Sequence, residues 1–89
     1  MITIKQYSEK INISVKDLKG NSRKHEFSIP RQVYWYYLQT QGATLSEISR
    51  KYNRKYPTII HGIDRIKGFL QVKEKSIIPF LEALDVFSY

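Results

Sequence analysis

The sequence predicts an all-helical fold, a small helical domain that contains a helix-turn-helix. Apolar residues recur at intervals of three and four along most of the 89 residues. Residues 14–17 and 44–47 have the form of a capping box, which starts a helix. Over residues 44–70 a short capped helix, a tight turn and a longer amphipathic helix follow one another, as a helix-turn-helix requires. A chain of this length has room for one modest core, so we expect a single domain over residues 1–89.

The first part of the chain predicts two short helices and a basic loop. Ile4, Tyr7 and Ile11 lie at helical spacing, and Ser14 can cap a second helix. Residues 19–28 (KGNSRKHEFS) are polar, basic and poor in apolar side chains. We therefore expect an exposed loop there, which can serve as a flexible basic arm.

Proline marks the next boundary. The residue before a proline avoids helical backbone, and Pro30 suits the first turn of a helix, so we expect a helix over about residues 31–41. Residues 34–38 (YWYYL) are aromatic on too many sides to be buried entirely. We assign these aromatic side chains to core packing rather than to base stacking.

The helix-turn-helix follows this helix, which Gly42 closes. In the segment TLSE, Thr44 can accept a hydrogen bond from the amide of Glu47 while the Glu47 carboxylate reaches back, so a helix is expected over residues 45–52. Asn53 is one of the few residue types other than glycine that tolerate left-handed backbone, so it can begin the turn. The next helix is expected to start near residue 56 or 57.

Projecting residues 57–70 at 100 degrees per residue separates two faces. One face holds Ile59, Ile60, Ile63, Ile66 and Leu70, and the other holds Thr58, His61, Gly62 and Arg65, with Arg54 and Lys55 just before the first turn. A helix in the DNA major groove requires such a layout, and glycine gives little bulk where the backbone meets DNA. The alternatives are a solvated histidine, a capping threonine, a glycine that allows close helix packing and an arginine that faces water.

A last helix is expected around residues 76–86. Pro79 lies in its first turn, and Ile77, Ile78, Phe80, Leu81 and Leu84 can pack back on the core. No repeat or low-complexity tract appears along the chain.

Positive charge is concentrated in the middle of the chain. From Lys16 to Lys67 there are 11 Lys and Arg against 4 Asp and Glu, which accounts for the whole net charge of +7. A surplus of this size attracts polyanions, so nucleic acid is the first partner to consider and an anionic membrane surface the second. A charged surface that only keeps the chain in solution is the alternative.

Several classes of function are disfavoured. Without cysteine there is no disulfide framework and no thiolate zinc site, and the apolar stretches are too short for a membrane span. No nucleophile–base pair, carboxylate dyad or phosphate-binding Gly-rich loop is evident, and His25 and His61 alone do not make a site. We therefore expect no enzyme activity, no cofactor, no metal, no small-molecule substrate and no membrane association.

Three stretches, NSRKHEFSIPRQ, TLSEIS and NRKYPTIIHG, occur in this order. They resemble the C-terminal DNA-binding domain, domain IV, of DnaA, the bacterial chromosomal replication initiator. That family carries an arginine-rich stretch before Pro-Arg-Gln, then Ser-Leu-Pro-Glu-Ile-Gly, then Gly-Gly-Arg-Asp-His-Thr-Thr-Val-Leu-His-Ala. The resemblance covers nearly the whole chain and implies a helix-turn-helix domain of the Trp-repressor-like kind that binds double-stranded DNA.

The resemblance also implies roles for the matching residues. Arg23 reaches the minor groove from the loop, and Arg31 and Gln32 contact phosphates near the start of their helix. Leu45 and Ser46 fall where the first helix of the helix-turn-helix approaches the DNA backbone with its N-terminus, where amide groups and the helix dipole favour phosphate. The base-reading signature covers Lys55, Tyr56, Pro57, Thr58 and His61, follows Arg54, and has Arg65 on the same projected face.

The sequence departs from the family at the base-reading positions. The family's Asp-His-Thr is Lys55-Tyr56-Pro57 here, and Asn53 stands in place of two glycines. An aspartate can accept a hydrogen bond from a cytosine amino group, whereas a lysine prefers guanine acceptors or a phosphate. We therefore expect the family's mode of DNA binding with a different target sequence.

The expected function is sequence-specific binding of double-stranded DNA, related to replication initiation or its regulation, in the cytoplasm at the nucleoid. A replication initiator or another replication protein is a further expected partner. One alternative is a protein-interaction module that regulates or competes with a replication initiator, and another is a small transcriptional regulator.

Overall fold

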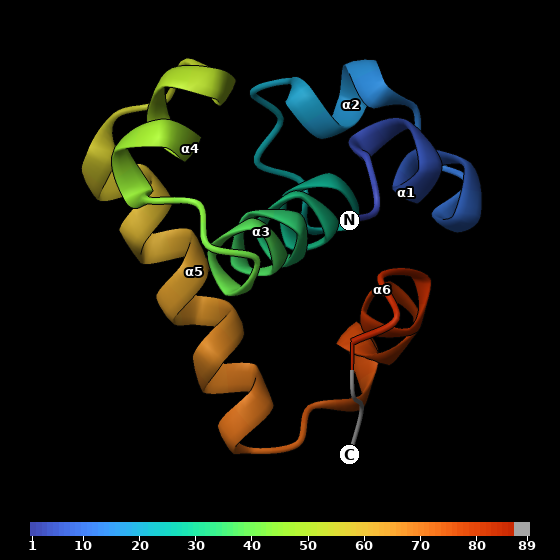
Figure 1. The fold of residues 1–89 in the computed structure, drawn as a ribbon. Coiled ribbons are helices and arrows are strands. Elements are labelled where there is room, and N and C mark those ends of the chain that lie inside the picture. The colour runs from blue at the N-terminus through green and yellow to red at the C-terminus, as the bar shows by residue number, and fades with distance from the viewer. Residues whose placement is uncertain (87–89) are drawn as a thin grey trace.

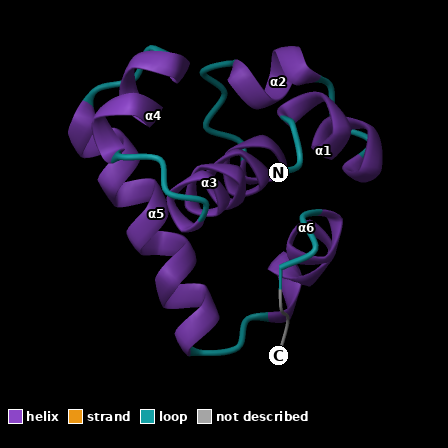
Figure 2. Ribbon diagram, viewed as in Figure 1, coloured by secondary structure: helices purple, strands orange, loops and turns teal. Residues whose placement is uncertain are grey.

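The computed structural model describes residues 1–86, and Figures 1 and 2 show that they are built from helices. In chain order these are α1 (Ile4–Ile11), α2 (Val15–Lys19), α3 (His25–Thr40), α4 (Leu45–Tyr52), α5 (Tyr56–Gln71), the 3-10 turn η1 (Lys75–Ile77) and α6 (Ile78–Ala83). No strand occurs within residues 1–86, and the predicted all-α fold is confirmed. Residues 87–89 of the expected domain lie outside the described part.

Helix α3 is the centre of the fold. It packs against α2, α4, α5 and α6, and Figure 1 shows α4 and α5 on one side of it and α1, α2 and α6 on the other. Its aromatic side chains Tyr34, Trp35 and Tyr37 are buried, while Tyr36 is half-buried. The assignment of this cluster to packing is therefore confirmed.

The start of α3 differs from the sequence-based expectation. The helix begins at His25, so the expected basic loop of residues 19–28 is reduced to residues 20–24. Pro30 lies inside the helix, where it cannot donate a backbone hydrogen bond. The site nevertheless favours helix, because Pro30 is fully buried and its carbonyl accepts a hydrogen bond of 2.8 Å from the hydroxyl of Tyr7.

The helix-turn-helix elements form where the sequence predicts them. Thr44 Oγ1 accepts from the amide of Glu47 at 3.1 Å, and Glu47 Oε1 accepts from the amide of Thr44 at 3.2 Å, so the capping box is complete. The hydrogen bond that the Thr44 amide donates to the Glu47 carboxylate is the largest cause that holds the pKa of Glu47 below its ordinary value, and the Thr44 hydroxyl adds to it. Asn53 ends α4 in the left-handed region, with φ 51° and ψ 49°, and α5 begins at Tyr56.

Helix α5 lies close against α3 because Gly62 has no side chain. A Cβ atom at Gly62 would lie 2.9 Å from Gln32 Cγ and 2.9 Å from two ring atoms of Trp35. Gly62 is buried, so the expectation that it faces outward toward DNA is wrong, and the alternative of close helix packing holds. Ile59 and Ile63 are buried on the same helix, as the projection predicts.

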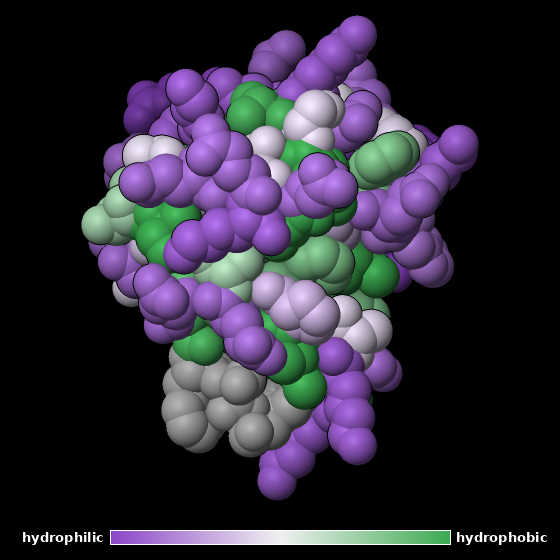
Figure 3. Space-filling view, turned by 90° about the vertical axis from the view of Figure 1, so that its right-hand side faces the viewer, coloured by the Kyte–Doolittle hydropathy of each residue, from purple (hydrophilic) through white to green (hydrophobic). Residues whose placement is uncertain are grey.

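The chain returns to the core after α5. The helix expected at residues 76–86 is present as η1 followed by α6 and ends at Ala83, with Ile77, Leu81 and Leu84 buried. Figure 3 shows hydrophilic side chains over much of the face that carries α1, α2 and α6, with apolar residues visible between them. Within the described residues, no helix combines the length and the apolar character that crossing a membrane demands.

Candidate nucleic-acid interface

A basic cleft joins the loop before α3 to the outer side of α5. Its volume is about 440 Å³, and four arginines but no carboxylate are found among its described lining residues. The lining residues are Asn21, Ser22, Arg23, Ser28, Arg31, Gln32, Trp35, Arg54, Thr58 and Arg65. We call this hollow the arginine cleft. It brings together six of the residues that the sequence singled out, from three separate segments.

Arg31 is placed differently from the expectation. It lies in the middle of α3 rather than near its start, and only 6% of its surface is exposed. Its Nε donates to the carbonyl of Leu18, its Nη1 to that of Ser22 and its Nη2 to that of Asp17, each at 2.8 Å. The guanidinium thus binds the end of α2 and the following loop. Arg31 is therefore not an exposed residue at the start of a helix, which is where the phosphate contact was expected.

The surroundings of Arg31 lower the pKa of its guanidinium group. Burial lowers the pKa of Arg31 from its ordinary value, the nearby charge of Arg54 lowers it further, and Asp17 raises it. Two guanidinium groups therefore lie close enough to repel each other. The carbonyl acceptors around them offset that repulsion, because unpaired carbonyls at a helix C-terminus attract cations.

Arg54 is held in a similar way from the other side. It lies in the turn between α4 and α5, where Ser49 Oγ donates to its carbonyl. Its Nη1 donates to the carbonyl of Tyr52 at 3.0 Å, and its Nη2 donates to the carbonyls of Lys19, at 2.9 Å, and Gly20. The side chain therefore connects the helix-turn-helix to the end of α2.

Arg65 and Gln32 meet across the packing of α5 on α3. Arg65 Nη1 lies 3.4 Å from Gln32 Oε1, and its guanidinium carbon lies 5.5 Å from the centre of the Phe69 ring. The ring face attracts the cation. Arg65 is half-buried and so has a defined position on the wall of the arginine cleft rather than a free side chain.

The first turns of α5 present the remaining candidate base-reading residues. Lys55, Tyr56, Pro57, Thr58 and His61 are all exposed, and Tyr56 is one of the most exposed large apolar residues. Lys55 is the N-cap and makes no side-chain capping hydrogen bond, and no acidic residue lies in the first turn. This end of the helix is therefore positive and accessible, as binding to an anionic polymer requires.

The N-terminus of α4 and the loop tip complete the candidate set. Ser46 is exposed and Leu45 is half-buried against the core. The capping box uses the amides of Thr44 and Glu47 and not those of Leu45 and Ser46. Arg23 is exposed in the loop at the edge of the arginine cleft.

The cleft also contains residues that the sequence did not single out. Asn21 and Ser22 lie in the expected basic loop, and their place in that loop is the only sequence feature that could have pointed to them. Ser28 belongs to the same expected loop, and it is buried because α3 continues through residues 25–30. Trp35 is buried in the core, as expected, and borders the cleft from there.

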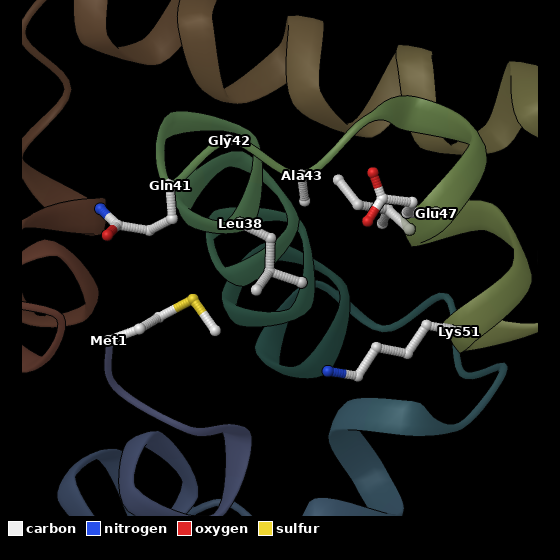
Figure 4. A pocket seen from close by; sticks show the side chains of 8 residues that line it. Met1, Leu38, Gln41, Gly42, Ala43, Glu47 and Lys51 are labelled. Carbon is white, nitrogen blue, oxygen red and sulfur yellow. The ribbon is translucent and has the colours of Figure 1, made fainter.

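A second cavity, of about 340 Å³, lies away from these residues. Figure 4 shows it between Met1, the C-terminal end of α3 and the side chains of Glu47 and Lys51 on α4. None of the candidate residues lines it. Across residues 1–86, no group of three or more His, Cys, Asp or Glu side chains is arranged to hold a metal ion.

Comparisons with known proteins agree with one another. The family model described as the bacterial dnaA protein helix-turn-helix matches residues 3–66. The chromosomal replication initiator protein DnaA of Crocosphaera subtropica is 36% identical over 86 residues, which cover 94% of this chain and 19% of that protein. DnaA of Desulfotalea psychrophila is 39% identical over 57 residues, which cover 63% of this chain and 12% of that protein. The chain thus spans about a fifth or less of these relatives, and no solved structure matches it.

Proposed function

Because the chain belongs to the family of bacterial DnaA helix-turn-helix domains, we propose that it binds double-stranded DNA in a sequence-specific manner. Helix α5 lies in the major groove in this proposal, and the loop of residues 20–24 places Arg23 in the adjacent minor groove. A rigid helix suits the wide major groove of B-form DNA, whereas A-form RNA hides its own major groove.

The observation that carries the proposal is the arginine cleft between the loop and α5. A phosphate strand must pass between an element in the major groove and one in the neighbouring minor groove. The cleft lies between those two elements, and its described lining has four arginines and no carboxylate. Arg23 is exposed and Arg65 is half-buried, so these two can contact a phosphate directly, while Arg31 and Arg54 bind backbone carbonyls and add positive charge behind them. Phosphate contacts of this kind supply affinity and position the protein, while base contacts supply specificity.

The exposed first turns of α5 supply the base contacts in this proposal. Lys55 favours the O6 and N7 acceptors of guanine, and the apolar surfaces of Tyr56 and Pro57 favour the methyl group of thymine. Thr58 and His61 extend the same surface by hydrogen bonding. Because a lysine cannot accept a hydrogen bond from cytosine, the preferred sequence differs from that of a family member with aspartate at this position.

The biological role that fits is replication initiation or its regulation, at the nucleoid in the cytoplasm. The relatives are named chromosomal replication initiator proteins, and this chain matches the part of them that the helix-turn-helix model covers. No phosphate-binding Gly-rich loop occurs in its sequence, so we propose that DNA binding, and not ATP hydrolysis, is its contribution. A replication initiator is the proposed protein partner.

Selection of bound sequences from random duplex DNA at two salt concentrations tests the function. An enriched motif and an affinity that falls steeply with salt are expected. No enrichment and no salt dependence would refute DNA binding and direct attention to a protein-interaction module.

Two lysine variants of α5 give the matched comparison. Lys55→Ala should change the enriched motif, whereas Lys67→Ala removes the same charge from an exposed position about 18 Å further along the helix and should leave the motif unchanged. The same motif in both variants would contradict the role of Lys55 in base reading.

A further inference from the structure

The guanidinium of Arg54 is directed toward the end of α2, although its position in the turn before α5 suggests a DNA contact. Its hydrogen bonds to the carbonyls of Lys19 and Gly20 join parts of the chain 34 and 35 residues apart. A third hydrogen bond, to the carbonyl of Tyr52, fixes the guanidinium plane on its own side of the turn. Three of the five N–H donors of the guanidinium are used in these hydrogen bonds, so a base contact would compete with them for the orientation of the side chain.

The carbonyl groups that accept from Arg54 continue a row that Arg31 begins. The carbonyls of Asp17 and Leu18 accept from Arg31, and those of Lys19 and Gly20 accept from Arg54. Three of them are the last carbonyls of α2, a helix of five residues, and the fourth belongs to its C-cap Gly20, so they lie at the negative end of the helix dipole. The Asp17 carbonyl also accepts a hydrogen bond of 3.3 Å from the Gly20 amide. Two cations thus hold the point where α2 passes into the loop.

That point determines where Arg23 lies. Only Asn21 and Ser22 separate Arg23 from Gly20, and the carbonyl of Ser22 is itself held by Arg31. Arg31 reaches this segment from the core helix α3, whereas Arg54 reaches it from the helix-turn-helix. Arg54 is therefore the residue that relates the loop to the start of the reading helix α5.

We propose that Arg54 is a positioning residue, which fixes the loop of residues 20–24 and its Arg23 at a set distance from α5 so that both grooves are engaged together. The inference rests on the proposed DNA binding and goes beyond it by assigning Arg54 to the protein rather than to the bases. A lysine at this position keeps the charge but cannot bridge carbonyls on both sides in the planar arrangement of a guanidinium.

Hydrogen exchange in the free protein tests the contact without DNA. Arg54→Lys should speed exchange of the α2 amides, such as Leu18 and Gly20, by about tenfold, because charged hydrogen bonds that stabilise the local closed state are lost. Arg50→Lys makes the same change at an exposed position of α4 and should leave these amides unaffected. Equal exchange in the two variants would overturn the proposal.

A double-mutant cycle tests how Arg54 acts on binding. Arg54→Lys should weaken binding to the selected duplex about tenfold in the wild-type background and add almost nothing when Arg23→Ala is already present. Losses that multiply, or no loss from Arg54→Lys, would overturn the positioning role. If the wild-type chain does not bind DNA in a salt-dependent way, the proposed function fails, and the exchange comparison still decides whether Arg54 holds the loop.

Discussion

Replacing Gly62 by alanine should destabilise the protein, although alanine favours helix. The new Cβ would lie 2.9 Å from Gln32 Cγ and from the Trp35 ring, whereas unstrained carbon atoms stay about 3.5–4.0 Å apart. The ring of Trp35 is buried and cannot withdraw, so α5 must move away from α3. Overpacking of this kind costs about 1–3 kcal/mol, and the gain in helix propensity returns about 1 kcal/mol. The expected net loss is about 1 kcal/mol, within a range from about 0 to about 2 kcal/mol.

Gly68 on the same helix provides the control. It is exposed, and a Cβ there would meet nothing within 4 Å, so Gly68→Ala should stabilise the protein by up to about 1 kcal/mol. The propensity gain is common to both variants, so their difference isolates the overpacking cost of about 1–3 kcal/mol. Urea unfolding followed by fluorescence of the single tryptophan measures it. If Gly62→Ala is as stable as Gly68→Ala and loses only DNA affinity, Gly62 faces DNA and the packing argument is refuted.

Three further predictions concern single positions. Arg31→Met should lower the free energy of unfolding by about 2–4 kcal/mol, because three carbonyls lose a charged donor. A free energy of unfolding within about 0.5 kcal/mol of wild type, measured by thermal unfolding, would contradict this. The lowered pKa of Glu47 means that its contribution to stability is present above the ordinary pKa of a glutamate and is lost as the pH falls through the lowered value. Glu47→Gln, which does not titrate, should therefore lose less stability than wild type between about pH 5 and about pH 3, and parallel acid unfolding curves would refute the assignment. Asn53→Ala should cost about 1 kcal/mol because of the left-handed backbone, while Asn53→Gly should stay within about 0.5 kcal/mol of wild type; equal stability of the two in urea unfolding would argue against a backbone cause.

Local chemistry explains which elements could be predicted from the sequence. The capping box of Thr44 and Glu47 and the left-handed Asn53 depend on residues within a few positions of one another, so the sequence contained all the partners. The apolar face of α5 is likewise a local pattern, and Ile59 and Ile63 are buried as predicted. The family resemblance added the order of the motifs, which the family match over residues 3–66 confirms.

Contacts distant in sequence explain what could not be predicted. Pro30 favours a helix start by local rules, but its burial and the hydrogen bond from Tyr7, 23 residues away, favour continued helix instead. The N-cap Lys24 makes no side-chain capping hydrogen bond, so no signal marks the true start.

The hydrogen-bond partners of Arg31 and Arg54 could not be predicted for the same reason. Arg31 and Arg54 appear in the sequence as positive charges. Apart from Tyr52, the residues whose carbonyls accept from them lie 9 to 35 positions away. Gly62 belongs to the outward face by projection alone, and only the path of α3 across α5 decides that this side is covered. The candidate DNA-contacting residues themselves remain predictions.

Because α3 lies at the centre of the fold, changes in its buried residues should alter how much protein is folded and able to bind DNA, and not which DNA sequence it prefers. Trp35 and Tyr34 of α3 complete a core that α4 and α5 share, so the helix-turn-helix has no separate core of its own. Unfolding should therefore be cooperative over the whole bundle, and a peptide of residues 44–71 should not fold. Substitutions in the buried side of α3 will reduce the fraction of folded, binding-competent molecules while leaving the ranking of target sequences unchanged. Variation in this helix can thus adjust how often a site is filled without redirecting the protein to another one.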